Sequence, residues 1–180
     1  GMIRAVSEVR ALLGWLEPQS TSIALCGLSL GSAVAALTSH LDERVAAVAL
    51  YTPILGLNHM IGLHLWRWGS SGQQSAALLQ SDTVAAMTSV IEPLATVPRT
   101  DRRLIVGAWN DRMAMRSSAS AMHERWGGEL YWHDGSHVGH LFSPEVARAT
   151  DRFLGSFDPP CPRGIRYSTE AARSLSGTRQ

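Results

Sequence analysis

Three residues whose types cooperate in nucleophilic catalysis occur in this chain in the order serine, aspartate, histidine. Ser29 is the central residue of the pentapeptide GLSLG at 27–31, and Asp111 and His137 follow it. A serine hydroxyl is a weak nucleophile until a base removes its proton, and a histidine base needs an acid to orient it. The three residues therefore predict a Ser-His-Asp triad that attacks an acyl carbonyl.

The segments on both sides of Ser29 indicate how its hydroxyl would be presented. Residues 22–26 form an apolar run typical of a strand, and residues 32–37 are small residues typical of a helix. Glycines two positions before and two positions after the serine leave room for a sharp turn between the two elements. The helix would direct its positive end at an oxyanion formed there. The alternative interpretation is a glycine-lined turn with an inert serine.

The two partners of Ser29 also have alternative interpretations. Asp111 belongs to the segment 110–112 that directly follows the apolar run 104–109, and an aspartate in that position is often a turn residue or helix N-cap. His137 lies in a run that also holds His133 and His140, so three histidines compete for the role of base. A metal site is the other hypothesis for this cluster, but glycines interrupt it and no second ligand cluster occurs. We expect His137 to be the base, with His140 as the fallback, and no metal or other cofactor.

The pattern of apolar residues predicts the elements that must position these side chains. Continuous apolar runs are typical of strands buried on both faces of a parallel sheet, and they alternate with helical spacing. We expect an α/β fold in which helices flank about four parallel strands in a three-layer sandwich. The expected strands are 22–26, 45–51, 104–109 and 129–132, and the expected helices are 3–16, 32–37, 117–126 and 144–154.

Two segments depart from this alternation inside a predicted domain of residues 1–157. Residues 55–98 form an insertion that we expect to lie as a cap over the carboxyl ends of the strands. The insertion has a glycine-serine break at 69–72, a helical run from 73 to 91, and aromatic residues such as Trp66 and Trp68 that line an acyl pocket or pack within the cap. Residues 158–180 are rich in proline, arginine and serine and predict a loose tail.

Composition excludes several classes of protein. The 180 residues are 45% hydrophobic and 17% charged, with a net charge of +1, which is typical of a globular domain without strong attraction to nucleic acid. No apolar run is long enough to span a membrane, and the start lacks the apolar stretch of a signal peptide. Gly1 before Met2 is typical of a residue left by cloning, so we expect the native chain to begin at Met2. Cys26 and Cys161 are expected to be free thiols in the cytoplasm.

From residue 23 to about residue 157, the chain resembles the second half of an α/β-hydrolase. The matching motifs are the nucleophile elbow at 27–31, the acid turn at 110–112 and the histidine loop at 135–137. The resemblance implies a serine esterase or thioesterase that acts on a small acyl substrate through an acyl-serine intermediate. It also implies that Ser29 is the nucleophile, His137 the general base, Asp111 the orienting acid, and the Leu30 N–H one oxyanion donor.

The beginning of the chain departs from this family. The family has about eight strands and places the elbow after the fifth, whereas one predicted helix precedes the elbow here. The elbow strand would then be an exposed apolar edge, and the loop that gives the second oxyanion donor would be missing. Three explanations stay open: a longer native chain, a truncated binding or structural module, or a homodimer paired through this edge. We expect self-association, and the alternative function is a catalytically impaired homodimeric module.

Overall fold

The computed structural model describes residues 1–155. The predicted tail at 158–180 and Cys161 lie outside the described residues. The described strands are β1 (Ile23–Leu28), β2 (Val45–Tyr51), β3 (Arg103–Ala108) and β4 (Glu129–His133). The α-helices are α1 (Met2–Leu16), α2 (Leu30–Leu41), α3 (Leu57–Leu65), α4 (Gly69–Leu79), α5 (Asp82–Thr88), α6 (Arg116–Trp126) and α7 (Pro144–Gly155).

The four strands form one parallel sheet in the order β1-β2-β3-β4, so strands that follow one another in sequence are neighbours. In β2 and β3 nearly every residue is buried, as the uninterrupted apolar runs predicted for strands covered on both faces. Parallel neighbours need a crossover at each connection, and helices form these crossovers. The carboxyl ends of all four strands therefore lie at one edge of the sheet.

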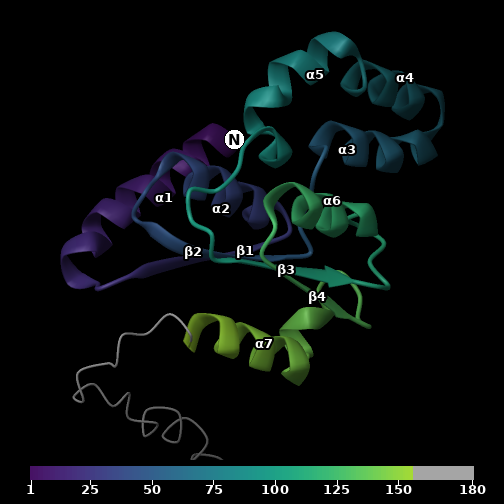
Figure 1. Ribbon diagram of the computed structural model, residues 1–180. Helices are drawn as coiled ribbons and strands as arrows, with labels where there is room; N and C mark the ends of the chain where they lie inside the picture. Colours follow the sequence, from purple (N-terminus) through teal and green to yellow (C-terminus); the bar gives the residue numbers. More distant parts are fainter. Residues whose placement is uncertain (156–180) are drawn as a thin grey trace, which may run out of the picture.

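Helices cover the two faces of this sheet (Figure 1). On one face, α2 and α6 pack on the sheet through a cluster that includes Val48, Leu50 and Ile105. On the other face, α7 packs through Val146 and Phe153 on small or branched residues of β2 and β3. Successive strand side chains point to opposite faces, which explains why alternate residues of β2 enter different clusters. The predicted three-layer α/β architecture is confirmed.

The insertion between β2 and β3 is helical and extends beyond the sheet beside the end of α6 (Figure 1). Two details of its predicted structure were wrong. The glycine-serine segment 69–72 begins α4 instead of breaking a helix, and the expected run 73–91 is divided between α4 and α5 at Gln80 and Ser81. Trp66 and Trp68 are exposed, so neither pocket lining nor core packing describes them.

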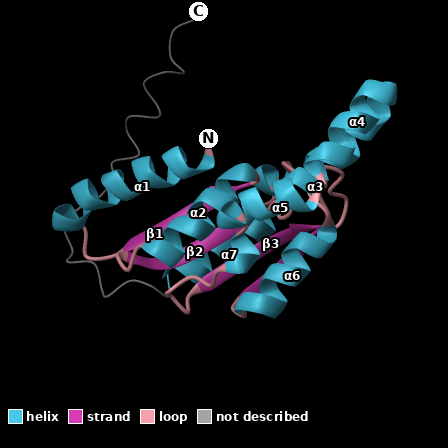
Figure 2. Ribbon diagram, turned by 90° about the horizontal axis from the view of Figure 1, so that it is seen from above, coloured by secondary structure: helices cyan, strands magenta, loops and turns pink. Residues whose placement is uncertain are grey.

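The elbow strand β1 is an edge strand: within residues 1–155 it pairs with β2 alone. Figure 2 shows α1 at this side of the molecule and α6 at the opposite side. Val6 and Leu13 are the buried residues of α1, which packs on α2. Cys26 is exposed, because the edge position leaves one face of β1 less covered than the faces of β2 and β3.

Candidate active site

Ser29 stands on the sharp turn between β1 and α2 in a conformation that non-glycine residues rarely adopt. Its φ is 54° and its ψ is −118°, in the left-handed region of φ. The Ser29 N–H donates to the Tyr51 carbonyl oxygen at 2.9 Å, which joins the turn to the end of β2. The Ser29 carbonyl accepts from the backbone N–H and the hydroxyl of Ser32. Bonds on both sides of the residue thus hold it in this strained conformation.

The two glycines of the pentapeptide are not equivalent. A Cβ at Gly27 would lie 2.5 Å from the Gly31 carbonyl oxygen and 2.7 Å from the Ser32 Cα, so no side chain fits there. A Cβ at Gly31 would have no atom within 4 Å beyond its neighbours and its own helix. The prediction that both glycines make room is therefore correct for Gly27 and wrong for Gly31, which faces open space.

Asp111 lies three residues after the end of β3, at the start of a tight turn. Its Oδ1 accepts hydrogen bonds from the backbone N–H groups of Met113 at 2.8 Å and Ala114 at 2.9 Å. Its Oδ2 lies 2.7 Å from the Nδ1 of His137, and the Asp111 side chain is 3% exposed. The turn-residue interpretation and the acid interpretation therefore both describe Asp111, since one oxygen closes the turn and the other is free to orient the histidine.

His137 completes a continuous hydrogen-bonded chain with Ser29 and Asp111. Its Nε2 lies 2.7 Å from the Ser29 Oγ, and its Nδ1 bonds to Asp111 on the other side of the ring. A carboxylate only accepts, so Nδ1 carries the hydrogen and Nε2 of the neutral ring is free to accept from the Ser29 hydroxyl. The arrangement has the bonds and tautomer that a general base for a serine nucleophile needs.

Backbone bonds connect the acid turn to the histidine loop. The Trp109 N–H donates to the His133 carbonyl at 3.0 Å, and the Asn110 N–H donates to the Gly135 carbonyl at 3.2 Å. The Asn110 side-chain amide also donates to the Asp134 carbonyl. The two loops that carry Asp111 and His137 are therefore held together over several residues.

The other two histidines of the run have different surroundings. His133 accepts from the Gly135 N–H through Nδ1, and His140 donates from Nδ1 to the His137 carbonyl. Burial lowers the pKa of both rings, which favours their neutral forms. His140 stacks on Tyr51 and meets the His133 ring edge to face. The structure brings neither ring to Ser29, so the fallback assignment of His140 as the base is not supported by its position.

Leu30 is the first residue of α2, directly after Ser29. The Leu30 N–H is one of the N–H groups at the start of a helix that have no acceptor within the helix, whereas the Ser32 N–H of the same turn is bonded to the Ser29 carbonyl. Within residues 1–155, only α1 and a short 3-10 helix precede β1. The described residues therefore hold no strand and loop in the position from which the family takes its second donor.

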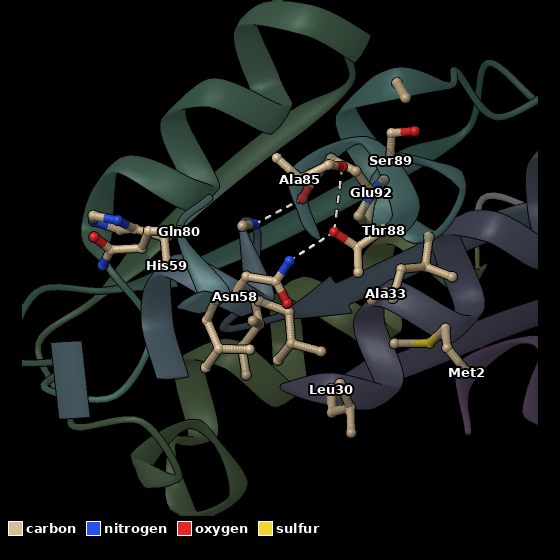
Figure 3. A pocket seen from close by; sticks show the side chains of 17 residues that line it. Met2, Leu30, Ala33, Asn58, His59, Gln80, Ala85, Thr88, Ser89 and Glu92 are labelled. Carbon is tan, nitrogen blue, oxygen red and sulfur yellow. Dashed lines mark hydrogen bonds between the residues drawn. The ribbon is translucent and has the colours of Figure 1, made fainter. Parts of the chain in front are cut away.

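A cavity of about 390 Å³ adjoins the elbow between α2 and the helical insertion (Figure 3). Leu30 and Ala33 of α2 and Met2 of α1 lie on one side of it, and residues of α3 and α5 lie on the other. Its lining is largely apolar, and several of its polar side chains are hydrogen-bonded to other residues. The Asn58 amide donates to the Thr88 hydroxyl at 2.6 Å, and Glu92 accepts from the Gly56 N–H at 2.9 Å.

The sequence analysis missed one polar residue at this edge of the sheet. Thr52 directly follows β2, is 2% exposed, and donates from its hydroxyl to the His137 carbonyl. The available signal was its position, because it ends a buried strand beside the strand that carries Ser29. Threonine itself has no obvious chemistry in that position, so the sequence pattern did not point to it.

Residues 1–155 contain neither a cluster of metal-ligating side chains nor a membrane-spanning helix. No group of three or more histidine, cysteine, aspartate or glutamate side chains in this range is arranged to hold a metal ion. No helix in the same range is long and apolar enough to cross a membrane.

The chain resembles part of two longer proteins but matches no family model. An uncharacterized protein of Mycobacterium tuberculosis strain H37Rv is 28% identical over 166 residues, and its counterpart in strain CDC 1551 matches equally. The match covers 89% of this chain and 40% of the relative, so the chain spans about two fifths of the length of the curated relatives it matches.

Several solved structures share the fold at low sequence identity. An esterase of Pyrococcus furiosus has a TM-score of 0.61 at 14% identity, covering 84% of this chain and 61% of the esterase. The α/β-hydrolase GrgF of a Penicillium species has a TM-score of 0.59 at 14% identity, covering 86% and 72%. A metagenome-derived lipolytic enzyme has a TM-score of 0.55 at 15% identity, covering 83% and 72%. The sheet order, the flanking helices and these likenesses agree: the described chain has the α/β-hydrolase fold, in a four-stranded form.

Proposed function

We propose that this protein is a serine hydrolase that cleaves a carboxylic ester or thioester. The single observation that supports this most is the hydrogen-bonded chain from the Ser29 Oγ to His137 and on to Asp111, with both distances at 2.7 Å. Ser29 also has the strained backbone of a nucleophile on a strand-to-helix turn. The likeness to an esterase and a lipolytic enzyme supports the same class of reaction.

In the first half of the reaction, the Ser29 Oγ attacks the acyl carbon while His137 takes the hydroxyl proton on Nε2. The carbonyl oxygen becomes an oxyanion, to which the Leu30 N–H and the positive end of α2 offer stabilisation. The tetrahedral intermediate collapses, the bond to the alcohol or thiol breaks, and His137 returns the proton to that leaving group. Asp111 stabilises the imidazolium form of His137 throughout this step.

In the second half, a water molecule attacks the acyl-serine and gives its proton to His137 Nε2. Collapse of the second intermediate returns that proton to the Ser29 Oγ and releases the carboxylic acid. Each proton that leaves Ser29 or water is thus carried by the same imidazole nitrogen, and the residues return to their starting state. No group beyond the three side chains, water and the oxyanion donor takes part.

The cavity beside the elbow supports an apolar acyl group as part of the substrate. It adjoins Leu30, the residue next to the nucleophile, and its lining is largely apolar. Asn58, Thr88 and Glu92 of the lining are hydrogen-bonded to other residues, so an alkyl chain beside them would leave these bonds intact. A volume of about 390 Å³ is in the range of small-molecule sites.

The decisive experiment is covalent labelling with a fluorophosphonate, which reacts with an activated serine. We expect the wild type to be labelled and Ser29→Ala to be unlabelled, because the probe needs the activated Ser29 oxygen. Ser75→Ala, which changes an exposed serine of α4 outside the site, is the matched control and should label like the wild type. Folded wild-type protein that takes no label would contradict the proposed function.

A second experiment tests the acyl cavity. Ala85 of α5 lines the cavity and the neighbouring Ala86 does not, so Ala85→Leu and Ala86→Leu form a matched pair. We expect Ala85→Leu to shift kcat/KM toward shorter acyl chains in a series of p-nitrophenyl esters, by about tenfold for the longest chains. Ala86→Leu should keep the wild-type chain-length profile. Equal profiles for both variants would remove the cavity from the acyl site.

The exposed edge of β1 supports a second candidate function, a catalytically impaired module that pairs with a copy of itself. Within residues 1–155, β1 has an unpaired edge, and the described oxyanion site offers a single backbone donor next to Ser29. Analytical ultracentrifugation at micromolar concentration and ester turnover distinguish the candidates. A dimer without turnover favours the second candidate, whereas turnover that His137→Ala abolishes excludes an idle module.

A further inference from the structure

Thr52 shares with Ser29 a rare backbone conformation. They are the two non-glycine residues with positive φ in residues 1–155, and φ of Thr52 is 43°. This conformation is especially unfavourable for a β-branched residue such as threonine. Thr52 is held in it by a backbone bond, since its N–H donates to the Val106 carbonyl at 2.8 Å. Such strain persists where the surrounding structure enforces it, and it often accompanies function.

The strained backbone directs the Thr52 hydroxyl to one acceptor, the carbonyl oxygen of His137. The Oγ1–O distance is 3.1 Å and the bond is buried. The same carbonyl oxygen accepts from the Nδ1–H of His140, also at 3.1 Å. A carbonyl oxygen has two lone pairs, so these two donors satisfy it fully. The pair of donors fixes the backbone of the candidate base from two directions.

Both donors depend on the end of β2. Thr52 follows its last residue, Tyr51, and the Tyr51 ring stacks on the His140 ring at a centroid distance of 5.4 Å and an angle of 16°. Tyr51 is in turn held by its hydroxyl, which bonds to Thr150 of α7 at 2.8 Å. The His137 carbonyl is therefore anchored to a central strand and not only to its own loop.

The site needs such an anchor because the loop that carries His137 has little regular structure to fix it. His137 lies between β4 and a 3-10 helix, in a segment that contains Gly135 and has no regular structure of its own. Its ring must nevertheless reach Ser29 with one nitrogen and Asp111 with the other. A small displacement of a catalytic group can cost a large factor in rate, so the loop backbone has to be fixed.

We propose that Thr52 is a positioning residue, whose hydroxyl holds the His137 backbone so that the imidazole bridges Ser29 and Asp111. This inference rests on the proposed function for its catalytic consequence, but its structural content can be measured without turnover. Thr52 does not contact the substrate or the reacting atoms. It acts through the carbonyl of His137.

Three variants test the proposal. Thr52→Val removes the hydroxyl and keeps the branched shape, whereas Thr52→Ser keeps the hydroxyl. Thr38→Val makes the same chemical change at a fully buried threonine of α2 whose hydroxyl has no hydrogen-bond partner among the described residues. Thermal unfolding first establishes that each variant is folded.

Proton NMR of each variant then reports the bond from His137 Nδ1–H to Asp111 as a low-field resonance. We expect Thr52→Val to lose or broaden this resonance, and its fluorophosphonate labelling rate and ester kcat to fall about 10- to 100-fold with little change in KM. Thr52→Ser and Thr38→Val should keep the wild-type resonance and rates. A Thr52→Val protein that keeps the wild-type resonance overturns the proposal, as does an equal loss in Thr38→Val.

The same experiment separates the two proposals. A wild type that shows the low-field resonance but takes no fluorophosphonate label removes the hydrolase function. The resonance in Thr52→Val and Thr52→Ser still decides whether Thr52 positions His137. If Thr52→Ser loses the resonance as Thr52→Val does, the hydroxyl is not the group that fixes the His137 backbone.

Discussion

Two aspartates of this protein are buried to almost the same extent but have partners of different chemistry. The Asp42 side chain is 4% exposed and accepts from Arg44 Nη2 at 2.6 Å and Arg10 Nε at 3.1 Å. The Asp111 side chain is 3% exposed and bonds to His137 and to two backbone amides. Burial alone therefore does not distinguish the structural carboxylate from the candidate catalytic one.

The difference lies in whether the partner can exchange a proton. An arginine stays charged at any ordinary pH, whereas histidine gains and loses its proton near neutrality. Asp42 caps the end of α2, and its two arginines come from α1 and from the turn just before β2, so it joins α1, α2 and the approach to β2. The hydrogen bond from Arg44 holds the pKa of Asp42 well below its usual range. Asp42 thus stabilises the fold, while Asp111 orients a group that can move protons.

The largest expected effect comes from Asp111→Asn. An asparagine can keep the turn through its oxygen but presents an amide donor to His137, which favours the tautomer that cannot accept the Ser29 proton. We expect kcat on a p-nitrophenyl ester to fall about 10⁴-fold, with stability changed by less than about 1 kcal/mol. Turnover and thermal unfolding of the same preparation check both parts. A variant that keeps its activity would remove Asp111 from the site.

Asp42→Asn should give the opposite pattern. The change removes the charge that Arg44 and Arg10 bind and replaces one accepting oxygen by an amide nitrogen that only donates, so we expect the free energy of unfolding to fall by about 2 kcal/mol. Labelling of Ser29 in the folded variant should be unchanged, because Asp42 lies at the end of α2 far from the elbow. Urea unfolding measures the loss. If the variant is as stable as the wild type but inactive, the contrast between the two aspartates fails.

The pH dependence of stability gives a finer test of Asp42. Because its pKa is lower in the folded protein than in the unfolded chain, acid protonates the unfolded chain first and favours unfolding. The contribution of Asp42 is therefore fully present above about pH 4 and is lost as the pH falls further. Urea unfolding of wild type and Asp42→Asn over this range should show their difference shrinking in acid. A difference that stays constant as the pH falls would contradict the assignment.

The smallest expected effect is that of Arg10→Met. The Arg10 side chain is 48% exposed, and methionine keeps much of its apolar stem, so we expect a loss of less than about 1 kcal/mol. Arg4→Met in the same helix removes an exposed pair with Glu8 and serves as the control, with a smaller effect still. Chemical denaturation of both variants makes the comparison. A loss as large as that of Asp42→Asn would mean that Arg10, and not Arg44, is the main partner.

Much of the fold could be predicted because its signals are local. The apolar run 45–51 coincides with β2, and the helix expected at 3–16 is α1 with one further residue. The turn at Ser29 was predicted from a strand, glycines at 27 and 31 and a helix in succession, and the nearness of Gly31 and Ser32 to a Cβ at position 27 explains why a glycine is needed at 27. The candidate residues Ser29, Asp111 and His137 were named from their order along such elements.

Other features could not be predicted, because they depend on which segments meet in space. Trp66 and Trp68 are aromatic residues of the kind that line pockets or pack in cores, but in the folded insertion both side chains are exposed to solvent. The choice among His133, His137 and His140 depended on the conformation of one loop relative to two strand ends. The catalytic roles themselves stay predictions that the labelling experiment addresses.

The sequence by itself determined the four strands, the helices that pack on the sheet and the residue types present at the carboxyl edge of the sheet, but not the helices of the insertion. These follow from patterns within ten or twenty residues, where periodicity and chain stereochemistry act directly. The tertiary structure decided that the His137 Nε2 lies 2.7 Å from the Ser29 Oγ and that the Thr52 hydroxyl donates to the His137 carbonyl. Those contacts join residues 108 and 85 positions apart, so they depend on strand order and loop conformation that no local pattern contains.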